Sequence, residues 1–180
     1  MRQFKATLVL LLLACLVQPA FPQKRATLAQ QFYVMKLFNP NLKSVGVILS
    51  SEHLAKLKSA MARAALANGV KVVYAEVGDL HELGDAFSRL VEDNNIGFIW
   101  IPADDPVVCT DVAMKYLLKK AVLKGVGTCV PDKKWLSSGG TLYIGVEEGR
   151  VRPYFNVRLV EAMGMKVPEK YMSLATAEAQ

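Results

Sequence analysis

An unbroken apolar run, Ile-Gly-Phe-Ile-Trp-Ile at 96–101, ends abruptly in a segment of prolines and aspartates at 102–106. A strand that is covered on both faces inside a parallel sheet has this pattern, because neither face alternates with polar residues. A buried helix segment is the alternative, but the glycine, the β-branched and aromatic side chains and the prolines favour a strand. We therefore predict that 96–101 is the central strand of a sheet.

Short apolar runs alternate with segments of helical periodicity along the rest of the chain. The predicted strands are 44–49, 70–77, 96–101, 126–130 and 141–146. The predicted helices are 27–38, 52–68, 80–93, 106–124 and a last one that follows Gly149 and reaches about Met163. Such alternation with short connections requires right-handed crossovers and helices on both faces of the sheet. The predicted fold class is α/β: a doubly wound parallel five-stranded sheet in the order 2-1-3-4-5, within a three-layer sandwich.

The N-terminal region has the order of segments that a secretory signal has. Arg2 and Lys5 precede an apolar run at 6–17, which prolines follow, so we expect the mature chain to start near Lys24. The run is shorter than the roughly 20 apolar residues that a membrane-spanning helix needs. We expect a periplasmic or otherwise exported protein, and a lipid anchor at Cys15 is the alternative that we disfavour.

The length and the composition fit one folded domain with a proper core. The chain has 180 residues, of which 52% are hydrophobic, and a formal net charge of +6. We divide it into a signal peptide at 1–23, a leader helix within 24–42, a lobe at 43–168 and a C-terminal tail at 169–180. The lysine groups at 119–124 and 133–134 lack interleaved aromatic residues, so they indicate a solvated face and no nucleic-acid partner.

Polar residues follow the predicted strands at their carboxyl ends, which meet at one edge of a parallel sheet, where such folds bind ligands. The candidate ligand contacts are Ser50, Ser51, Asp79, Asp104, Asp105 and Asp132. Helix N-termini at this edge favour anions, whereas the carboxylates favour a cation or an ammonium group. The alternative for Asp79, Asp105 and Asp132 is an ordinary cap or turn.

The sequence has no signature of catalysis. No Gly-x-Gly-x-x-Gly and no P-loop follows the first strand, and serines stand there instead of the acidic residues of a phosphorylation site. His53 and His81 lie at helix starts without a nucleophile motif, and we expect both at the surface. We therefore predict no enzyme activity, no catalytic residues and no cofactor.

Two cysteines remain beyond the signal, Cys109 and Cys129. An exported pair could form a disulfide, and two separate buried thiols are an equally good interpretation. No cluster of cysteines and histidines accompanies them, so we predict no metal site.

Three segments carry a resemblance to a known family. They are Asn39–Val47 at the entry to the lobe, Phe98–Asp104 with the helix after it, and Ser138–Val146 with Glu148-Gly149-Arg150 after it. Together they resemble the exported substrate-binding proteins of ABC transporters, of the type I periplasmic-binding branch that includes binders of tryptophan and other amino acids. The likeness covers Pro40 to about Pro168 and consists of patterns of glycine and apolar residues.

The resemblance implies a lobe that binds a small organic solute, such as an amino acid, at the carboxyl edge of the sheet. Members of the family resemble two lobes that close over a ligand, whereas this chain has length for one. The resemblance thus implies a second lobe from a homodimer mate or another protein, and an ABC permease as a further partner. The alternative is an exported, non-enzymatic interaction or sensory module derived from such a lobe.

Overall fold

The structure is a computed structural model that describes residues 25–176. The predicted signal and the end of the predicted tail lie outside the described residues. The strands are β1 (Ser44–Ser50), β2 (Lys71–Val77), β3 (Phe98–Trp100), β4 (Gly127–Val130), β5 (Leu142–Glu147), β6 (Arg150–Asn156) and β7 (Ala175–Thr176). The α-helices are α2 (Leu28–Phe38), α3 (Ser51–Ala67), α4 (Leu83–Ser88), α5 (Asp111–Lys124) and α6 (Val157–Ala162). A π-helical turn, η1 (Arg89–Asp93), and two 3₁₀ helices, η2 (Lys133–Leu136) and η3 (Glu169–Leu174), complete the described elements.

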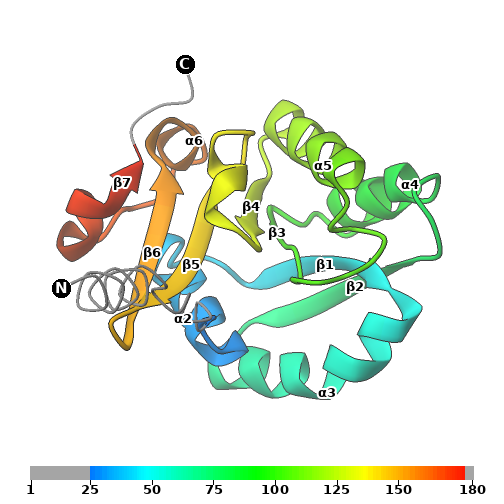
Figure 1. The fold of residues 1–180 in the computed structure, drawn as a ribbon, viewed down its shortest axis with the longest axis horizontal. Coiled ribbons are helices and arrows are strands. Elements are labelled where there is room, and N and C mark those ends of the chain that lie inside the picture. Colours follow the sequence, from blue (N-terminus) through cyan, green and yellow to red (C-terminus); the bar gives the residue numbers. More distant parts are fainter. Residues whose placement is uncertain (1–24, 177–180) are drawn as a thin grey trace, which may run out of the picture.

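A single sheet in the order β2-β1-β3-β4-β5-β6-β7 forms the centre of the fold (Figure 1). The strands β2, β1, β3, β4 and β5 are parallel to one another. The predicted order 2-1-3-4-5 is therefore confirmed for these strands, and the apolar run at 96–101 contains β3, between β1 and β4. Their carboxyl ends share one edge of the sheet.

The predicted strand count was wrong, because the sheet continues where we predicted the last helix. Residues 150–156 form β6, antiparallel to β5, and β7 adds a short parallel strand. Glu148 and Gly149, with φ of 51° and 75°, form the tight turn between β5 and β6. Pro153 disfavours a helix interior, and Asn156 caps α6 by accepting a hydrogen bond from the Leu159 N–H. The helix is thus confined to Val157–Ala162.

Two predicted helices are also shorter than expected. The helix predicted at 80–93 divides into α4 and the π-helical turn η1. The helix predicted from 106 begins at Asp111, with Thr110 as its N-cap, because residues 102–110 form turns. The N-terminal helix matches its prediction: Thr27 and Gln30 form a reciprocal capping box at the start of α2.

Helices cover both faces of the sheet, so the core has two apolar layers (Figure 1). The layer on the side of α2, α3 and α6 includes Phe32, Met35, Phe38, Val47, Met61, Phe155 and Val160. The layer on the side of α4 and α5 includes Ile48, Leu83, Phe87, Ile99, Met114, Leu117 and Leu118. α2 belongs to the first layer, with Phe32, Met35 and Phe38 fully buried. Among the described residues, no helix has both the length and the apolar character to cross a membrane.

Two neighbouring glycines give a test of this packing. A Cβ at Gly127 would lie 2.5 Å from Cδ2 of the buried Phe98 on the paired strand. We expect Gly127→Ala to destabilise the fold by about 1–3 kcal/mol, as overpacked core sites do. Urea unfolding followed by circular dichroism measures this change. The matched control is Gly97→Ala, whose Cβ would meet nothing within 4 Å; an equal loss in both variants would contradict the assigned packing.

Candidate functional site

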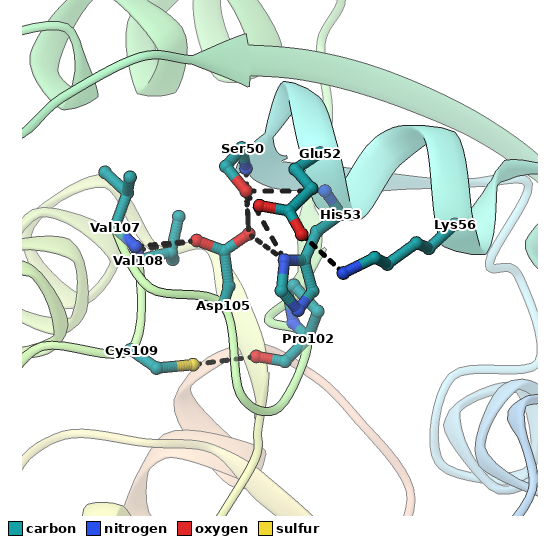
Figure 2. Close-up of polar contacts among 9 residues, drawn as sticks. All are labelled: Ser50, Glu52, His53, Lys56, Pro102, Asp105, Val107, Val108 and Cys109. Carbon is teal, nitrogen blue, oxygen red and sulfur yellow. Dashed lines mark hydrogen bonds and ion pairs between the residues drawn. The ribbon is translucent and has the colours of Figure 1, made fainter.

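One carboxylate joins the carboxyl ends of β1 and β3. Asp105, in the loop after β3, accepts hydrogen bonds at Oδ2 from the Ser50 backbone N–H (2.8 Å) and hydroxyl (3.0 Å). Its Oδ1 accepts from the N–H groups of Val107 (3.0 Å) and Val108 (2.9 Å), as Figure 2 shows. Because Ser50 ends β1 and caps α3, the carboxylate ties a strand end, a helix start and a loop together.

Asp105 is 1% exposed, and its environment keeps it ionised. Burial by itself raises the pKa of a carboxyl group, but the hydrogen bonds from Val108, Ser50 and Val107 outweigh it and hold the pKa of Asp105 below its usual range. Both oxygens of this candidate ligand contact are thus occupied by donors of the chain itself. Asp105 therefore holds the end of β1 and the loop after β3 in position.

His53 lies beside this pair (Figure 2). Its Nδ1 is 3.5 Å from Ser50 Oγ and 3.8 Å from Asp105 Oδ2, and only 16% of its side chain is exposed. The expectation of a surface position for His53 was therefore wrong. In a hydrolase triad the histidine stands between serine and acid and takes the proton of the serine. Here the Ser50 hydroxyl donates directly to Asp105, so the group is a brace rather than an activated nucleophile.

Asp104, next to the buried Asp105, points outward and pairs with Arg25. Both nitrogens at the end of the Arg25 side chain donate to the carboxylate, with Nη2 to Oδ1 at 3.1 Å. The Arg25 side chain remains 53% exposed and the Asp104 side chain 71% exposed. Their hydrogen bond raises the pKa of Arg25 and lowers the pKa of Asp104. The backbone of Asp104 is left-handed, with φ of 65°, a conformation that aspartate tolerates better than most residues.

A small cavity of about 40 Å³ lies beside this ion pair. Its lining residues are Arg25, Gln31, Trp100, Ile101, Ala103, Val130, Pro131, Tyr143 and Ile144. They come from the segment at the start of α2 and from the carboxyl ends of β3 and β4 with the adjoining part of β5. The Trp100 indole N–H donates to Gln31 Oε1 (2.6 Å), which fixes both side chains at the wall of the cavity.

The β5–β6 hairpin extends the site beyond the ends of the other strands. β4 ends at Val130, opposite Tyr143, whereas β5 continues to Glu147. The Tyr143 and Tyr154 rings are stacked, with centroids 6.1 Å apart, and Lys133 Nζ lies 3.7 Å from the Tyr154 ring centroid. Desolvation and the hydrogen bond that Tyr154 donates to Glu147 raise the pKa of Tyr154 to about 12. The hairpin thus places two stacked tyrosine rings at the carboxyl edge.

The other candidate contacts lie on separate turns. Ser51 is exposed in the first turn of α3. Asp79 accepts from the N–H groups of His81 (2.7 Å) and Glu82 (3.3 Å), and Asp132 accepts from the Lys134 N–H (2.9 Å) and caps η2. Both aspartates are exposed, and these bonds stay within their own turns. Of the predicted residues, the structure brings together Ser50 with Asp105, next to Asp104.

The two cysteines are separate free thiols, which is the second of the two interpretations left open. Cys109 lies in the turn before α5 and donates to the Pro102 carbonyl at 2.9 Å, whereas Cys129 is buried in β4. Burial raises the pKa of both thiols. Within residues 25–176, no group of three His, Cys, Asp or Glu side chains is placed to hold a metal ion.

Several residues at this edge were absent from the predicted contacts, above all Arg25, Gln31, Tyr143 and Tyr154. Arg25 and Gln31 stand before and within α2, more than sixty positions from β3 along the chain, and no local pattern signals that they meet. Tyr143 lies inside a predicted strand, so its place at the edge depends on how far β5 extends past β4. Such an offset follows from the pairing register, which the sequence alone does not fix.

Several solved structures have a similar fold, among them the following three. A conserved domain protein from Vibrio cholerae O1 biovar El Tor matches with a TM-score of 0.69 at 18% identity, over 85% of this chain and 60% of that protein. An ABC domain from Streptococcus pneumoniae in complex with L-Trp matches with a TM-score of 0.69 at 15% identity, over 83% and 59%. The ligand-free, open structure of CD0873, a substrate-binding protein with adhesive properties from Clostridium difficile, matches with a TM-score of 0.64 at 18% identity, over 80% and 57%.

These likenesses show that this chain shares its fold with a part of each of these proteins. The chain spans about 60% of the length of the first of these solved structures. No protein-family model matches the sequence, and no curated protein matches it either.

Replacement of Asp105 tests the brace. An asparagine has an NH₂ group in place of one carboxylate oxygen. That group would face the Ser50 N–H and O–H donors or the Val107 N–H, which now donate to Asp105. We expect Asp105→Asn to cost about 1–3 kcal/mol at pH 7, because a buried polar partner is left unsatisfied. Urea unfolding of both proteins measures the difference.

The same variant has a defined pH dependence. Because the pKa of Asp105 is lowered in the folded state, its stabilisation is present above the unfolded value of about 3.9 and is lost as pH falls through the lower folded value. The stability gap between wild type and Asp105→Asn should shrink below about pH 4. A gap that stays constant to lower pH would show that the ionised carboxylate is not the source of the effect. Ser50→Ala, which removes only the hydroxyl, is the milder comparison, at about 1 kcal/mol.

Proposed function

We propose that this chain is the solute-binding component of an exported ABC-type uptake system, and that it binds a small organic solute at the carboxyl edge of its sheet. The observation that carries the proposal is the Arg25–Asp104 pair at the mouth of the cavity beside Trp100 and Tyr143. The likeness of the fold to an ABC domain in complex with L-Trp and to a protein described as substrate-binding supports it.

The pair of opposite charges suits a solute that carries both an acidic and a basic group. A carboxylate of the solute can replace Asp104 on the Arg25 guanidinium, which binds planar carboxylates through two parallel hydrogen bonds. An ammonium group of the solute can then take the freed Asp104 carboxylate. Since both side chains are more than half exposed, this exchange needs no opening of the core. An amino acid is therefore the solute class that we favour.

The cavity itself is far too small for such a solute. Its volume of about 40 Å³ is close to that of one water molecule, which occupies about 30 Å³ in the liquid, whereas ligand pockets have about 300–1,000 Å³. The bound solute would therefore rest on the edge, between the β5–β6 hairpin and the loop after β3, and would need an opposing surface. We propose that a second lobe, from a dimer mate or another protein, supplies this surface.

The small cavity also favours a second candidate function. A lobe whose edge is almost filled by its own side chains could act as an exported interaction or sensory module without a solute. In that case a protein would occupy the edge directly, and Arg25 and Asp104 would contact its side chains.

A thermal-shift screen of the purified mature protein tests the proposal. Amino acids, small organic acids and sugars are added at millimolar concentration, and we expect at least one zwitterionic solute to raise the unfolding midpoint. A ligand at a hundred times its Kd stabilises the folded state by about 2.7 kcal/mol. Sedimentation in the presence of that solute shows whether the opposing surface comes from a second copy.

Arg25→Ala should abolish most of the shift, because it removes the group that holds the carboxylate. The control is Arg63→Ala, which removes the same charge from the exposed surface of α3, away from the edge. If no solute shifts the midpoint, or if the two variants respond alike, the binding proposal fails; a stable protein partner whose binding depends on Arg25 would then support the interaction module.

A further inference from the structure

The outer surface of α5 carries four exposed apolar side chains. They are Val112, Tyr116, Val122 and Leu123, and Val112 and Leu123 are 68% and 72% exposed. The opposite side of the same helix is already buried in the core through Ala113, Met114, Leu117, Leu118 and Ala121. α5 is thus apolar on two sides, and one of them has no cover within the described residues.

The exposed residues follow a helical stripe. Val112, Tyr116, Lys119 and Leu123 are separated by intervals of four, three and four residues, which places them along one line of the helix surface. A groove of about 290 Å³ continues the stripe toward α4, lined by Leu80, His81, Leu83, Gly84, Val112, Ala113 and Tyr116. Stripe and groove together form one surface, which we name the α5 surface.

Lysines surround this stripe. Lys115 and Lys120 flank it, Lys119 lies within it, and Lys124 stands at its end, whereas Asp111 is the one acidic residue of α5. All four lysines are exposed. Lys124 pairs with Glu92 at 2.8 Å, and Lys120 Nζ lies 5.8 Å from the Tyr116 ring centroid. The stripe on α5 therefore combines apolar groups with positive charge, whereas Asp79, Glu82 and Asp85 are exposed beside the groove.

The position of Lys119 helps to select the occupant. In a seam between two protein helices, the Lys119 ammonium would be enclosed among apolar side chains, which is costly without a partner. A second copy of the chain in a twofold arrangement would set the same lysines against one another. At a lipid surface, by contrast, a lysine keeps its stem among apolar groups and extends its ammonium to the phosphates, and tyrosine suits the interface.

We infer that the α5 surface docks on the headgroups of an anionic lipid bilayer, with Val112, Tyr116 and Leu123 in the interface and the lysines on lipid phosphates. α5 would then lie parallel to the membrane, as amphipathic interfacial helices do. The groove of this surface shares no lining residue with the cavity of the proposed solute site.

Hydrogen–deuterium exchange of the full chain tests this docking. The probes are vesicles of phosphatidylcholine alone and vesicles in which about one third of the lipid is phosphatidylglycerol. We expect slower exchange across Asp111–Lys124 with the anionic vesicles only. α3 lies on the opposite face of the sheet and serves as the internal reference (Figure 1). If the chain bound the vesicles only through the apolar run at 6–17, exchange in α3 and α5 would change alike.

Charge variants make the test specific. Each lysine near an anionic surface is worth roughly fivefold in partitioning, so Lys115→Gln, Lys119→Gln and Lys120→Gln combined should need about a hundred times more lipid for the same protection of α5. The control removes three positive charges elsewhere, through Lys58→Gln, Arg63→Gln and Lys71→Gln. Leu123→Ser should weaken the protection, whereas Leu66→Ser on α3, where the leucine is 83% exposed against 72% for Leu123, should not.

Four results of the vesicle experiments would overturn the inference, and a fifth comes from an acidic polypeptide. They are no protection with anionic vesicles, equal protection with neutral vesicles, an equal loss in the control charge variant, and protection that rises with protein concentration in the absence of lipid, which would indicate a second copy. Equal protection by polyglutamate, unaffected by Leu123→Ser, would also overturn it, because it would assign the surface to an acidic polypeptide.

Discussion

The geometry of the site depends on one buried carboxylate. Asp105 takes four hydrogen bonds and fixes the end of β1, the start of α3 and the loop after β3 in a single arrangement. Because Asp105 is directed inward, its neighbour Asp104 turns outward through a left-handed backbone conformation and meets Arg25. The two consecutive aspartates therefore have different roles. Asp105 holds the edge of the sheet together, and Asp104 places a negative charge on its surface.

The site is also the meeting point of segments that are far apart in the sequence. α2 packs into the core through Phe32, Met35 and Phe38. Because of this packing, Arg25 and Gln31 lie at the ends of β3 and β4. On the other side, β5 and β6 extend past the neighbouring strands and carry the stacked tyrosines. At this edge the ends of the strands, the Arg25–Asp104 ion pair and the stacked Tyr143 and Tyr154 rings therefore lie close together.

Much of the fold could be predicted from the sequence, because continuous apolar strands and capped helices are local patterns. The five parallel strands and their order follow from those patterns. β6 could not be predicted in the same way, since Arg150–Asn156 lies between a turn and a helix, and its residues become more buried along the strand instead of alternating between exposed and buried. At the site, Ser50, Asp104 and Asp105 were predicted from their places after strands, whereas the contacts of Arg25 and Tyr143 depend on packing and register.

The edge of the sheet at β6 and β7 affects whether copies of the protein can pair through their strands. The part of β7 that the structure describes pairs with Phe155 and Asn156, so the earlier residues of β6 lie beyond this pairing. Arg150, Arg152 and Pro153 occupy that stretch. Repelling charges and a residue without an N–H make a poor template for a neighbouring chain. This stretch of β6 is therefore a poor partner for a strand of a second copy, so contacts between copies would use other surfaces.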